Sequence, residues 1–303
     1  MSEYEKLAQE IRELCTQKQA VILAHNYQRA EVQDIADFTG DSLGLSREAA
    51  RTDAQIIVFC GVHFMAQTAK LLSPDKTVLL PQKAAGCPMA DMIDPESLRE
   101  FKAEHPGAPV VAYVNTTAEV KAESDICCTS SNAVAVVRSL KAETILFVPD
   151  QHLGRWVAKH VPEKRIILYG GFCPVHHSIT PDIVADAKRH HPQAVVMAHP
   201  ECPEDTLALA DVVLSTGGML DYARKSEARE FIVVTEFGIV HPLQKENPDK
   251  LFHQISSALC PNMKLTTLES VKRALVTGTQ EITIDPEVAR KARQSVERMV
   301  QIG

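Results

Sequence analysis

The chain has 303 residues, 45% of them hydrophobic and 23% charged, which is the ordinary composition of a globular protein. Its net charge of −7 and its lack of a long basic stretch argue against a nucleic-acid partner. Residues 1–14 are typical of a charged amphipathic helix and not of a signal peptide, and no apolar run reaches the ~18 residues of a membrane span, so we expect a cytoplasmic protein without a membrane partner.

Short β-branched runs recur along the chain and predict parallel strands that are buried on both faces. In each of three successive units, a first strand is followed by a helix and then by a second strand. The first strands are expected at residues 21–24, 110–112 and 194–198, and the second strands at residues 56–59, 144–148 and 231–234. Another helix follows in each unit, at residues 64–72, 152–160 and 251–259. A third strand is expected at residues 77–80 and 165–169, but the third unit shows no equivalent before Cys260.

Strands that alternate with helices predict an α/β/α sandwich in each unit. Beyond residue 261 the pattern changes, and two further helices are expected at residues 266–275 and 286–302. The second opens with Asp285-Pro286-Glu287, in which the aspartate is a cap and the proline occupies the first turn. We expect this tail to pack back on an earlier unit.

Three cysteine–proline pairs show that the units are repeats. Cys87-Pro88, Cys173-Pro174 and Cys260-Pro261 lie 86 and 87 residues apart. A regular spacing of this kind indicates one ancestral unit used three times. The sequence therefore predicts three homologous α/β/α domains around a pseudo-threefold axis, with one central site. We place their limits at residues 1–86, 87–172 and 173–261, with a helical tail at residues 262–303.

Polar residues recur with the same period. One follows each first strand, at the edge where open α/β sheets bind their ligands. Three other polar residues follow it in each unit, at offsets of 2, 12 and 17 residues. The four positions are His25, Tyr27, Asp37 and Ser42 in the first unit; Tyr113, Asn115, Asp125 and Ser130 in the second; and His199, Glu201, Asp211 and Thr216 in the third. Because equivalent positions of symmetric units converge on one axis, we expect these side chains to meet.

Ser42, Ser130 and Thr216 each precede a helical pattern. A helix N-terminus offers free N–H groups, so a hydroxyl there either caps the helix or shares those donors with an anion. Three such termini around one axis predict a site for phosphates or carboxylates. The recurring aspartates at positions 37, 125 and 211 are interpreted as helix or turn caps.

The repeated cysteines predict a metal centre, because disulfides are rare in the reducing cytoplasm. Three thiolates brought together by the fold suit a 4Fe–4S cluster with one open iron, which acts as a Lewis acid. Two other interpretations stay open: a zinc site of three cysteines with His176 or His177, and three buried cysteines at domain joints. Cys15, Cys60, Cys127 and Cys128 are expected to be packing residues, and Cys202 is interpreted as a neighbour of the site.

Two residues suit acid–base chemistry. Glu201 is the candidate general base, and Tyr27 is the candidate general acid or donor to a developing oxyanion. Asn115 has no useful pKa and is expected to orient a ligand. The alternative for His25, Tyr113 and His199 is an ordinary polar residue closing a strand, but their shared position in three repeats favours function.

Nine short motifs together resemble the quinolinate synthase (NadA) family over essentially the whole chain. They are HNYQ (25–28), GDS (40–42), GCP (86–88), YVN (113–115), TSSN (129–132), GFCPVH (171–176), MAHPEC (197–202), STGGM (215–219) and CPNMK (260–264). The resemblance implies three α/β/α domains around a pseudo-threefold axis and an oxygen-sensitive 4Fe–4S cluster. It also implies condensation of iminoaspartate with dihydroxyacetone phosphate to quinolinate, phosphate and water.

By the same resemblance, Cys87, Cys173 and Cys260 hold the cluster, and the catalytic residues are Tyr27, Glu201 and His25. The substrate-binding residues that it implies are His25, Ser42, Tyr113, Val114, Asn115, Ser130, His199, Pro200, Glu201 and Thr216. An L-aspartate oxidase or dehydrogenase upstream would supply the iminoaspartate. Some members carry a C-terminal CxxCxxC motif, whereas this chain has only Cys260 there, so a disulfide switch of that kind is not expected.

Two other classes of function remain open from the residues alone. One is a zinc-dependent hydrolase or lyase acting on a small anionic substrate. The other is a redox or metal sensor without enzymatic activity, which would need a macromolecular partner. No basic patch or recognition motif supports the sensor.

Overall fold

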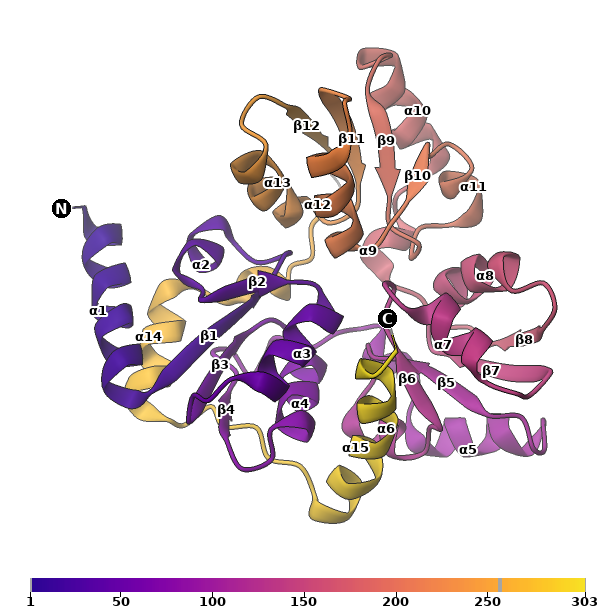
Figure 1. Ribbon diagram of the computed structural model, residues 1–303, viewed down its shortest axis with the longest axis horizontal. Coiled ribbons are helices and arrows are strands. Elements are labelled where there is room, and N and C mark those ends of the chain that lie inside the picture. The colour runs from indigo at the N-terminus through magenta and orange to yellow at the C-terminus, as the bar shows by residue number, and fades with distance from the viewer. Residues whose placement is uncertain (1, 256–257, 303) are drawn as a thin grey trace.

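The computed structural model describes residues 2–255 and 258–302. Its strands form three separate parallel sheets of four strands each, and the three sheets with their helices lie around a common centre (Figure 1). We call them the first, second and third units. This arrangement confirms the predicted α/β class with three repeated units.

The first unit contains one sheet between two layers of helices. Its elements are α1 (Glu3–Lys18), β1 (Ala20–His25), α2 (Ala30–Ile35), β2 (Phe38–Gly40), α3 (Ser42–Arg51), β3 (Ile56–Cys60), α4 (His63–Leu72) and β4 (Thr77–Leu79). The strand order is β2-β1-β3-β4, with every pair parallel. The buried residues of β1 and β3 contact α1 and α2 on one face and α3 and α4 on the other.

The second unit repeats this order. It begins with the 3₁₀ helix η1 (Ala90–Met92) and continues with α5 (Pro95–Ala103), β5 (Val110–Tyr113), α6 (Ala118–Ala122), β6 (Ile126–Cys128), α7 (Ala133–Ser139), β7 (Thr144–Val148), α8 (Gln151–His160) and β8 (Arg165–Leu168). The strand order is β6-β5-β7-β8. Strands β5 and β7 are almost wholly buried, as the continuous apolar runs predict.

The third unit has the same strand order, β10-β9-β11-β12. Its elements are α9 (Pro174–His177), α10 (Pro181–His190), β9 (Val195–Ala198), α11 (Glu204–Leu207), β10 (Val212–Val213), α12 (Thr216–Lys225), β11 (Glu230–Val234), η2 (Phe237–Ile239), α13 (Val240–Glu246) and β12 (Leu251–Gln254).

The predicted helix at residues 251–259 is wrong, and so is the statement that the third unit lacks a third strand. Residues 251–254 form the edge strand β12, which pairs in parallel with β11, and the helix before it is α13. The sequence of β12, Leu251-Phe252-His253-Gln254, has only two apolar residues in a row, and its residues are half-buried or exposed, so it carries no continuous apolar run of the kind that marks a buried strand. Residues 256 and 257 of the predicted helix lie outside the described residues.

The tail contributes to two units. It contains η3 (Met263–Leu265), α14 (Leu268–Thr277) and α15 (Pro286–Val300). Helix α14 packs against α1 on the first sheet, and α15 packs against α6 and β6 of the second unit as well as against α3 and α4 (Figure 1). The Asn132 side chain donates to the carbonyls of Met299 and Ile302, at 3.0 and 2.8 Å. The tail therefore holds the first and second units together.

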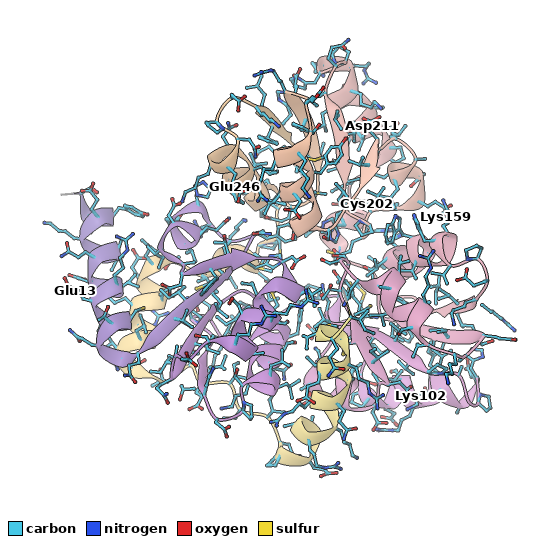
Figure 2. All side chains as sticks on the ribbon, viewed as in Figure 1. Glu13, Lys102, Lys159, Cys202, Asp211 and Glu246 are labelled. Atoms are coloured by element: carbon cyan, nitrogen blue, oxygen red, sulfur yellow. The ribbon has the colours of Figure 1, made fainter. Side chains whose placement is uncertain are left out.

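The recurring aspartates are not helix or turn caps, contrary to the prediction. In each unit the carboxylate accepts the backbone N–H of a residue 15 positions earlier, in or beside the first strand. Asp37 accepts from Ile22 at 2.7 Å, Asp125 from Val110 at 2.7 Å and Asp211 from Val196 at 2.8 Å. Each aspartate also donates its own N–H to the carbonyl of the same residue. This two-point pairing fixes the chain just before the edge strand of each sheet; Figure 2 labels Asp211.

We found no helix among the described residues that is long and apolar enough to cross a membrane.

Replacing Asp125 by alanine should lower the free energy of unfolding by about 1–3 kcal/mol, because the buried N–H of Val110 would lose its acceptor. Urea unfolding of the variant measures the loss. The matched control is Asp75→Ala at an exposed turn, which should change stability by less than about 0.5 kcal/mol. Equal losses of stability in Asp125→Ala and Asp75→Ala would contradict the hydrogen bond between Asp125 and the Val110 N–H.

Candidate functional site

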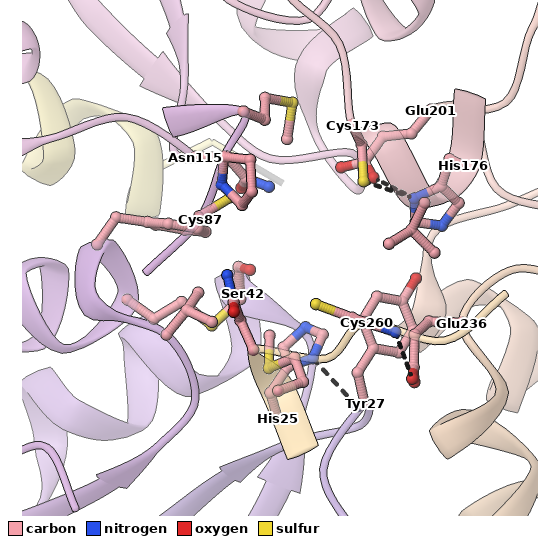
Figure 3. Close-up of a pocket in the computed structure, with 18 of the residues that line it drawn as sticks. His25, Tyr27, Ser42, Cys87, Asn115, Cys173, His176, Glu201, Glu236 and Cys260 are labelled. Atoms are coloured by element: carbon pink, nitrogen blue, oxygen red, sulfur yellow. Dashed lines mark hydrogen bonds and ion pairs between the residues drawn. The ribbon is translucent and has the colours of Figure 1, made fainter. Parts of the chain in front are cut away.

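The three units meet at one cavity of about 190 Å³, which lies at the carboxyl ends of the central strands. Nine of the recurring polar residues line it, together with the three repeated cysteines. Figure 3 labels the three cysteines and five of these polar residues, His25, Tyr27, Ser42, Asn115 and Glu201. These twelve residues are His25, Tyr27, Ser42, Tyr113, Asn115, Ser130, His199, Glu201, Thr216, Cys87, Cys173 and Cys260. Val114 and Pro200 are buried, and neither is among the residues that line the cavity.

Each of the three cysteines opens a turn of helix or 3₁₀ helix. Backbone N–H groups two and three residues further along hydrogen-bond the sulfurs of Cys87 and Cys260, and the N–H of His176 does so for Cys173. The proline after each cysteine suits the first position of such a turn, because no N–H is needed there. Local sequence thus directs backbone donors at all three sulfurs.

These sulfurs fit a shared metal centre. The pKa of Cys87 is raised to about 12, chiefly by burial and also by the neighbouring Cys260 thiol, whereas the N–H groups of Ala90 and Met89 act in the opposite direction. The sulfurs come from three different segments, none is in a disulfide, and no fourth cysteine of the described chain lines the cavity. Backbone N–H donors are the groups that stabilise thiolates bound to an iron–sulfur cluster. The three sulfurs and their backbone N–H groups therefore fit a metal centre that is held by three cysteines and has one metal position open to a ligand.

The zinc alternative has one observation in its favour. Ligand atoms of Cys173, His176 and Glu201 all lie within 4.8 Å of one another. However, both ring nitrogens of His176 have closer partners, because Nδ1 is 2.7 Å from Glu201 and Nε2 is 2.7 Å from Thr235. His176 is therefore held as a hydrogen-bonding group.

His25 and His199 occupy equivalent positions and have equivalent hydrogen bonds. The N–H of Tyr27 donates to His25 Nδ1 at 3.1 Å, and the N–H of Glu201 donates to His199 Nδ1 at 3.4 Å. Because Nδ1 is the acceptor in both rings, the hydrogen of the neutral ring resides on Nε2. His199 Nε2 lies 3.1 Å from the Ser130 hydroxyl. The Nε2–H of His199 is therefore directed at the Ser130 hydroxyl, whereas the Nε2–H of His25 has no hydrogen-bond partner among the described residues and is available to a ligand.

Glu201 is an ionised carboxylate in the cavity. Its Oε1 accepts the Tyr113 hydroxyl at 2.5 Å. Its Oε2 lies 2.7 Å from His176 Nδ1 (Figure 3). Burial by itself would raise the pKa of Glu201, but His176, His199 and the Tyr113 hydrogen bond outweigh burial and lower that pKa to about 2.

Tyr27 is held from both ends. Its hydroxyl lies 2.5 Å from Thr235 Oγ1, and its carbonyl accepts from the Lys264 ammonium. Burial, followed by the Glu201 charge, raises the pKa of Tyr27 well above its usual value. The hydroxyl is therefore protonated at neutral pH.

The hydroxyl residues are placed differently from one another. Ser42 and Thr216 are the first residues of α3 and α12, and the side chains that cap these helices belong to Asp41 and Ser215. Ser130 lies in the turn before α7 and is not at a helix start. Because neighbouring residues do the capping, Ser42 and Thr216 remain in the cavity wall as polar groups for a ligand.

Three polar lining residues were not among the predicted site residues: Asp41, Glu236 and Asn262; His176, which also lines the cavity, was considered only as a possible zinc ligand. Glu236 accepts the N–H of Cys260 at 3.2 Å and pairs with Lys264 at 2.9 Å. His176 and Asn262 follow the cysteines within three residues, so the cysteine turns themselves were the signal. Asn115 Oδ1 is buried and has no partner among the described residues, which indicates a donor on a ligand.

Two other features do not belong to the cavity. Cys202 lies in the third unit (Figure 2). It is buried, with its sulfur 3.6 Å from the Val234 carbonyl, and it is not among the residues that line the cavity. His191, Glu230 and His253 form a second group of possible metal ligands. Their two rings stack with centroids 3.4 Å apart, and His191 Nδ1 and His253 Nε2 both hydrogen-bond Glu230 Oε1, at 3.0 and 2.8 Å.

The fold and cavity define a class: three parallel α/β units around a three-cysteine site with donors for anions. The quinolinate synthetase A protein (NadA) family matches residues 9–301, so the chain belongs to this family. Quinolinate synthase of Dehalococcoides mccartyi is 55% identical over 299 residues, 98% of this chain and 99% of that protein. Quinolinate synthase of Thermodesulfovibrio yellowstonii is 53% identical over 298 residues, 98% of each chain. Quinolinate synthase of Geobacter metallireducens is 54% identical over 297 residues, 98% of this chain and 97% of that protein.

His25 and His199 should stay neutral from pH 8 to pH 5. Burial lowers the pKa of each imidazole from 6.5 to about 3. Between pH 3 and pH 6.5 the unfolded chain binds more protons than the folded protein. The contribution of these histidines to the free energy of unfolding is therefore complete above pH 6.5 and is lost as the pH falls toward 3. ¹⁵N NMR of labelled histidine, assigned with His25→Gln and His199→Gln, should show Nε2–H tautomers throughout. A protonation midpoint near 6.5 for either ring would contradict the assignment.

Proposed function

We propose that this chain is a quinolinate synthase of NAD biosynthesis, working in the cytoplasm. The reaction condenses iminoaspartate with dihydroxyacetone phosphate and yields quinolinate, phosphate and water. Membership of the quinolinate synthetase A family supports this proposal. The observation that carries it is the convergence of three cysteines, two neutral histidines and Glu201 on one cavity.

Cys87, Cys173 and Cys260 would hold a 4Fe–4S cluster. When bound, such a cluster supplies a Lewis acid at its open iron for a substrate oxygen. The support is the donor set itself, three sulfurs in one cavity, each with backbone N–H groups directed at it. Zinc bound by Cys173, His176 and Glu201, as in a hydrolase or lyase, is the second candidate, and metal analysis separates the two.

The cavity wall suits a diacid and a phosphate ester. The Nε2–H group of His25 donates to an anionic oxygen without carrying a charge of its own. Helices α3 and α12 begin at Ser42 and Thr216, where free N–H groups and the helix dipole favour anions. The other proposed substrate contacts are Tyr113, Asn115, Ser130 and His199, with Val114 and Pro200 behind the wall.

Glu201 and Tyr27 are the proposed acid–base pair. Glu201 is ionised and therefore ready to take a proton from a carbon or a hydroxyl of the substrate. Tyr27 retains its proton because of burial, so it can hydrogen-bond a substrate oxygen during dehydration. The His25 ring packs edge-on against the Tyr27 ring, with centroids 4.7 Å apart, and lines the same cavity.

We also propose the limits of the units as domains: residues 1–86, 87–172 and 173–261, followed by the tail at residues 262–303. Each of the three ranges contains one complete sheet, which supports them. The upstream supplier of iminoaspartate is proposed to be an L-aspartate oxidase or dehydrogenase.

Anaerobically prepared wild-type protein should form quinolinate from iminoaspartate and dihydroxyacetone phosphate. The Cys87→Ser variant should lose the brown colour of the cluster and at least about 100-fold of the activity, because one of three metal ligands is gone. Cys15→Ser, on the outer helix α1, is the matched control and should keep both. A colourless wild type, or a fully active Cys87→Ser, would reject the proposal.

Glu201→Gln should keep the cluster and the fold but lose about 10²–10⁴-fold in kcat, because an amide cannot accept the proton. Steady-state kinetics and iron content measure the two effects separately. Full activity in this variant would remove Glu201 from the mechanism.

A further inference from the structure

Two histidines and a glutamate of the third unit meet at one point away from the central cavity. His191 Nδ1 lies 3.0 Å from Glu230 Oε1, and His253 Nε2 lies 2.8 Å from the same oxygen. The three side chains each offer a ligand atom, and these atoms lie within 4.8 Å of one another. None of the three residues lines the cavity. We call His191, Glu230 and His253 the His–Glu–His triad.

Three elements of the third unit bring the triad together. Glu230 is the first residue of β11, and its side chain shares a face of the sheet with Ile232, two residues further on. His253 of β12 lies directly opposite Ile232 and therefore shares that face. Helix α10 covers the same face, because Ile232 and Val184 of α10 belong to one buried cluster, and His191 directly follows α10. Because Glu230 begins β11, the triad lies at the opposite end of this strand from the cavity.

The other two units do not have these groups. Strands β3 and β7 are equivalent to β11, and β4 and β8 are equivalent to β12, with the same register between neighbours. The residues at the places of Glu230 and His253 are Ile56 and Leu79 in the first unit, and Thr144 and Ile167 in the second. The repeated fold thus requires neither a carboxylate nor an imidazole here, and the triad is an addition to the third unit.

The Glu230 carboxylate has no lysine or arginine partner in the described part of the chain; its ion-pair partners are the two imidazoles. The neighbouring guanidinium groups are paired elsewhere. Arg229 lies 3.2 Å from Asp249, and Arg189 lies 2.6 Å from Asp186. A metal cation that binds this carboxylate therefore displaces no ammonium or guanidinium group.

The donor set suits a transition metal. Two imidazole nitrogens and one carboxylate oxygen are ligands that Zn²⁺ and similar divalent ions bind in proteins. Bonds of about 2.0–2.1 Å to zinc place neighbouring ligand atoms about 3.3 Å apart. The nitrogens of the triad lie 3.0 and 2.8 Å from the carboxylate oxygen, so small shifts make room for an ion. A neutral ring frees a lone pair for the ion by moving its hydrogen to its other nitrogen.

Binding also requires the two rings to turn out of their stack. The ring planes are 17° from parallel, so an ion between the two nitrogens lies outside both planes until the rings rotate. The side chains of His191 and His253 are 32% and 27% exposed, and β12 is an edge strand of its sheet. Rotation about the side-chain bonds therefore moves the rings toward solvent and leaves the core in place.

We propose that the His–Glu–His triad is a second metal site, which binds Zn²⁺ or a similar divalent transition-metal ion with water completing the coordination. The bound ion joins the end of α10 to β11 and β12, and so fastens the edge strand of the third unit. Because the site lies at the opposite end of β11 from the cavity, its role is structural. The inference is independent of the proposed function and of the three-cysteine centre.

The test compares the zinc content of anaerobically prepared wild type, His253→Gln and His191→Gln after equilibrium dialysis against Zn²⁺. His190→Gln is the matched control, because His190 is the neighbouring residue, is 69% exposed and bonds the Asp186 carbonyl. Wild type and His190→Gln should each bind about one zinc ion per chain more than the two triad variants. The difference cancels zinc held elsewhere, and either triad variant suffices if the other fails to fold. Equal zinc contents in all four proteins would overturn the proposal.

Two further measurements locate the ion. Zinc should slow amide hydrogen exchange of residues 251–254 about tenfold or more in the wild type and in His190→Gln, but not in His253→Gln, because the ion fastens β12. X-ray absorption at the zinc edge should show nitrogen and oxygen ligands at about 2.0–2.1 Å. A shell dominated by sulfur at about 2.3 Å would place the zinc at the cysteines and contradict the site. Exchange that zinc leaves unchanged would contradict its structural role.

Discussion

A parallel sheet brings the carboxyl ends of all its strands to one edge, and this constraint places the whole cavity. Strands β1, β5 and β9 each end beside the common centre, and the residue at or just after each strand end is His25, Tyr113 or His199. The paired aspartates hold the neighbouring edge strands in register with those central strands. A polar residue at a strand end thus becomes a cavity residue in all three units without any special loop.

The repeat places residues at equivalent positions around the cavity, and the different residue types at those positions give the cavity different chemical groups. Tyr27, Asn115 and Glu201 are equivalent in position, but one is protonated, one is neutral at any pH and one is ionised. The cysteine turns remain alike because all three sulfurs need the same backbone donors. By contrast, Thr235 and His176 have no chemical equivalents in the other units, and they connect the two residues proposed for proton transfer. Symmetry therefore suits the three-cysteine centre, whereas directional acid–base chemistry requires that symmetry be broken.

The repeat in the sequence predicted the sheets and the cavity-lining residues because both follow from positions that recur. The strand β12 was missed because its sequence, Leu251-Phe252-His253-Gln254, has only two apolar residues in a row and its residues are half-buried or exposed. The paired aspartates were assigned to the wrong partner because a carboxylate that accepts a strand N–H 15 residues away leaves no local signature. Thr235 could not be found from the repeat, because it looks like any other buried threonine until its neighbours in space are known. His176 was considered as a possible zinc ligand because it follows Cys173, but its hydrogen bonds to Glu201 and Thr235 could not be predicted from the sequence.

The most direct test of a three-cysteine cluster at the centre is the anaerobic iron and acid-labile sulfide content of the wild type and of Cys260→Ala, each with an absorbance spectrum. We expect about four iron and four sulfide per chain in the wild type, with the broad visible absorbance of a cubane, and loss of all of these in Cys260→Ala. Stoichiometric zinc without sulfide in the wild type, or an unchanged cluster in Cys260→Ala, would contradict the account.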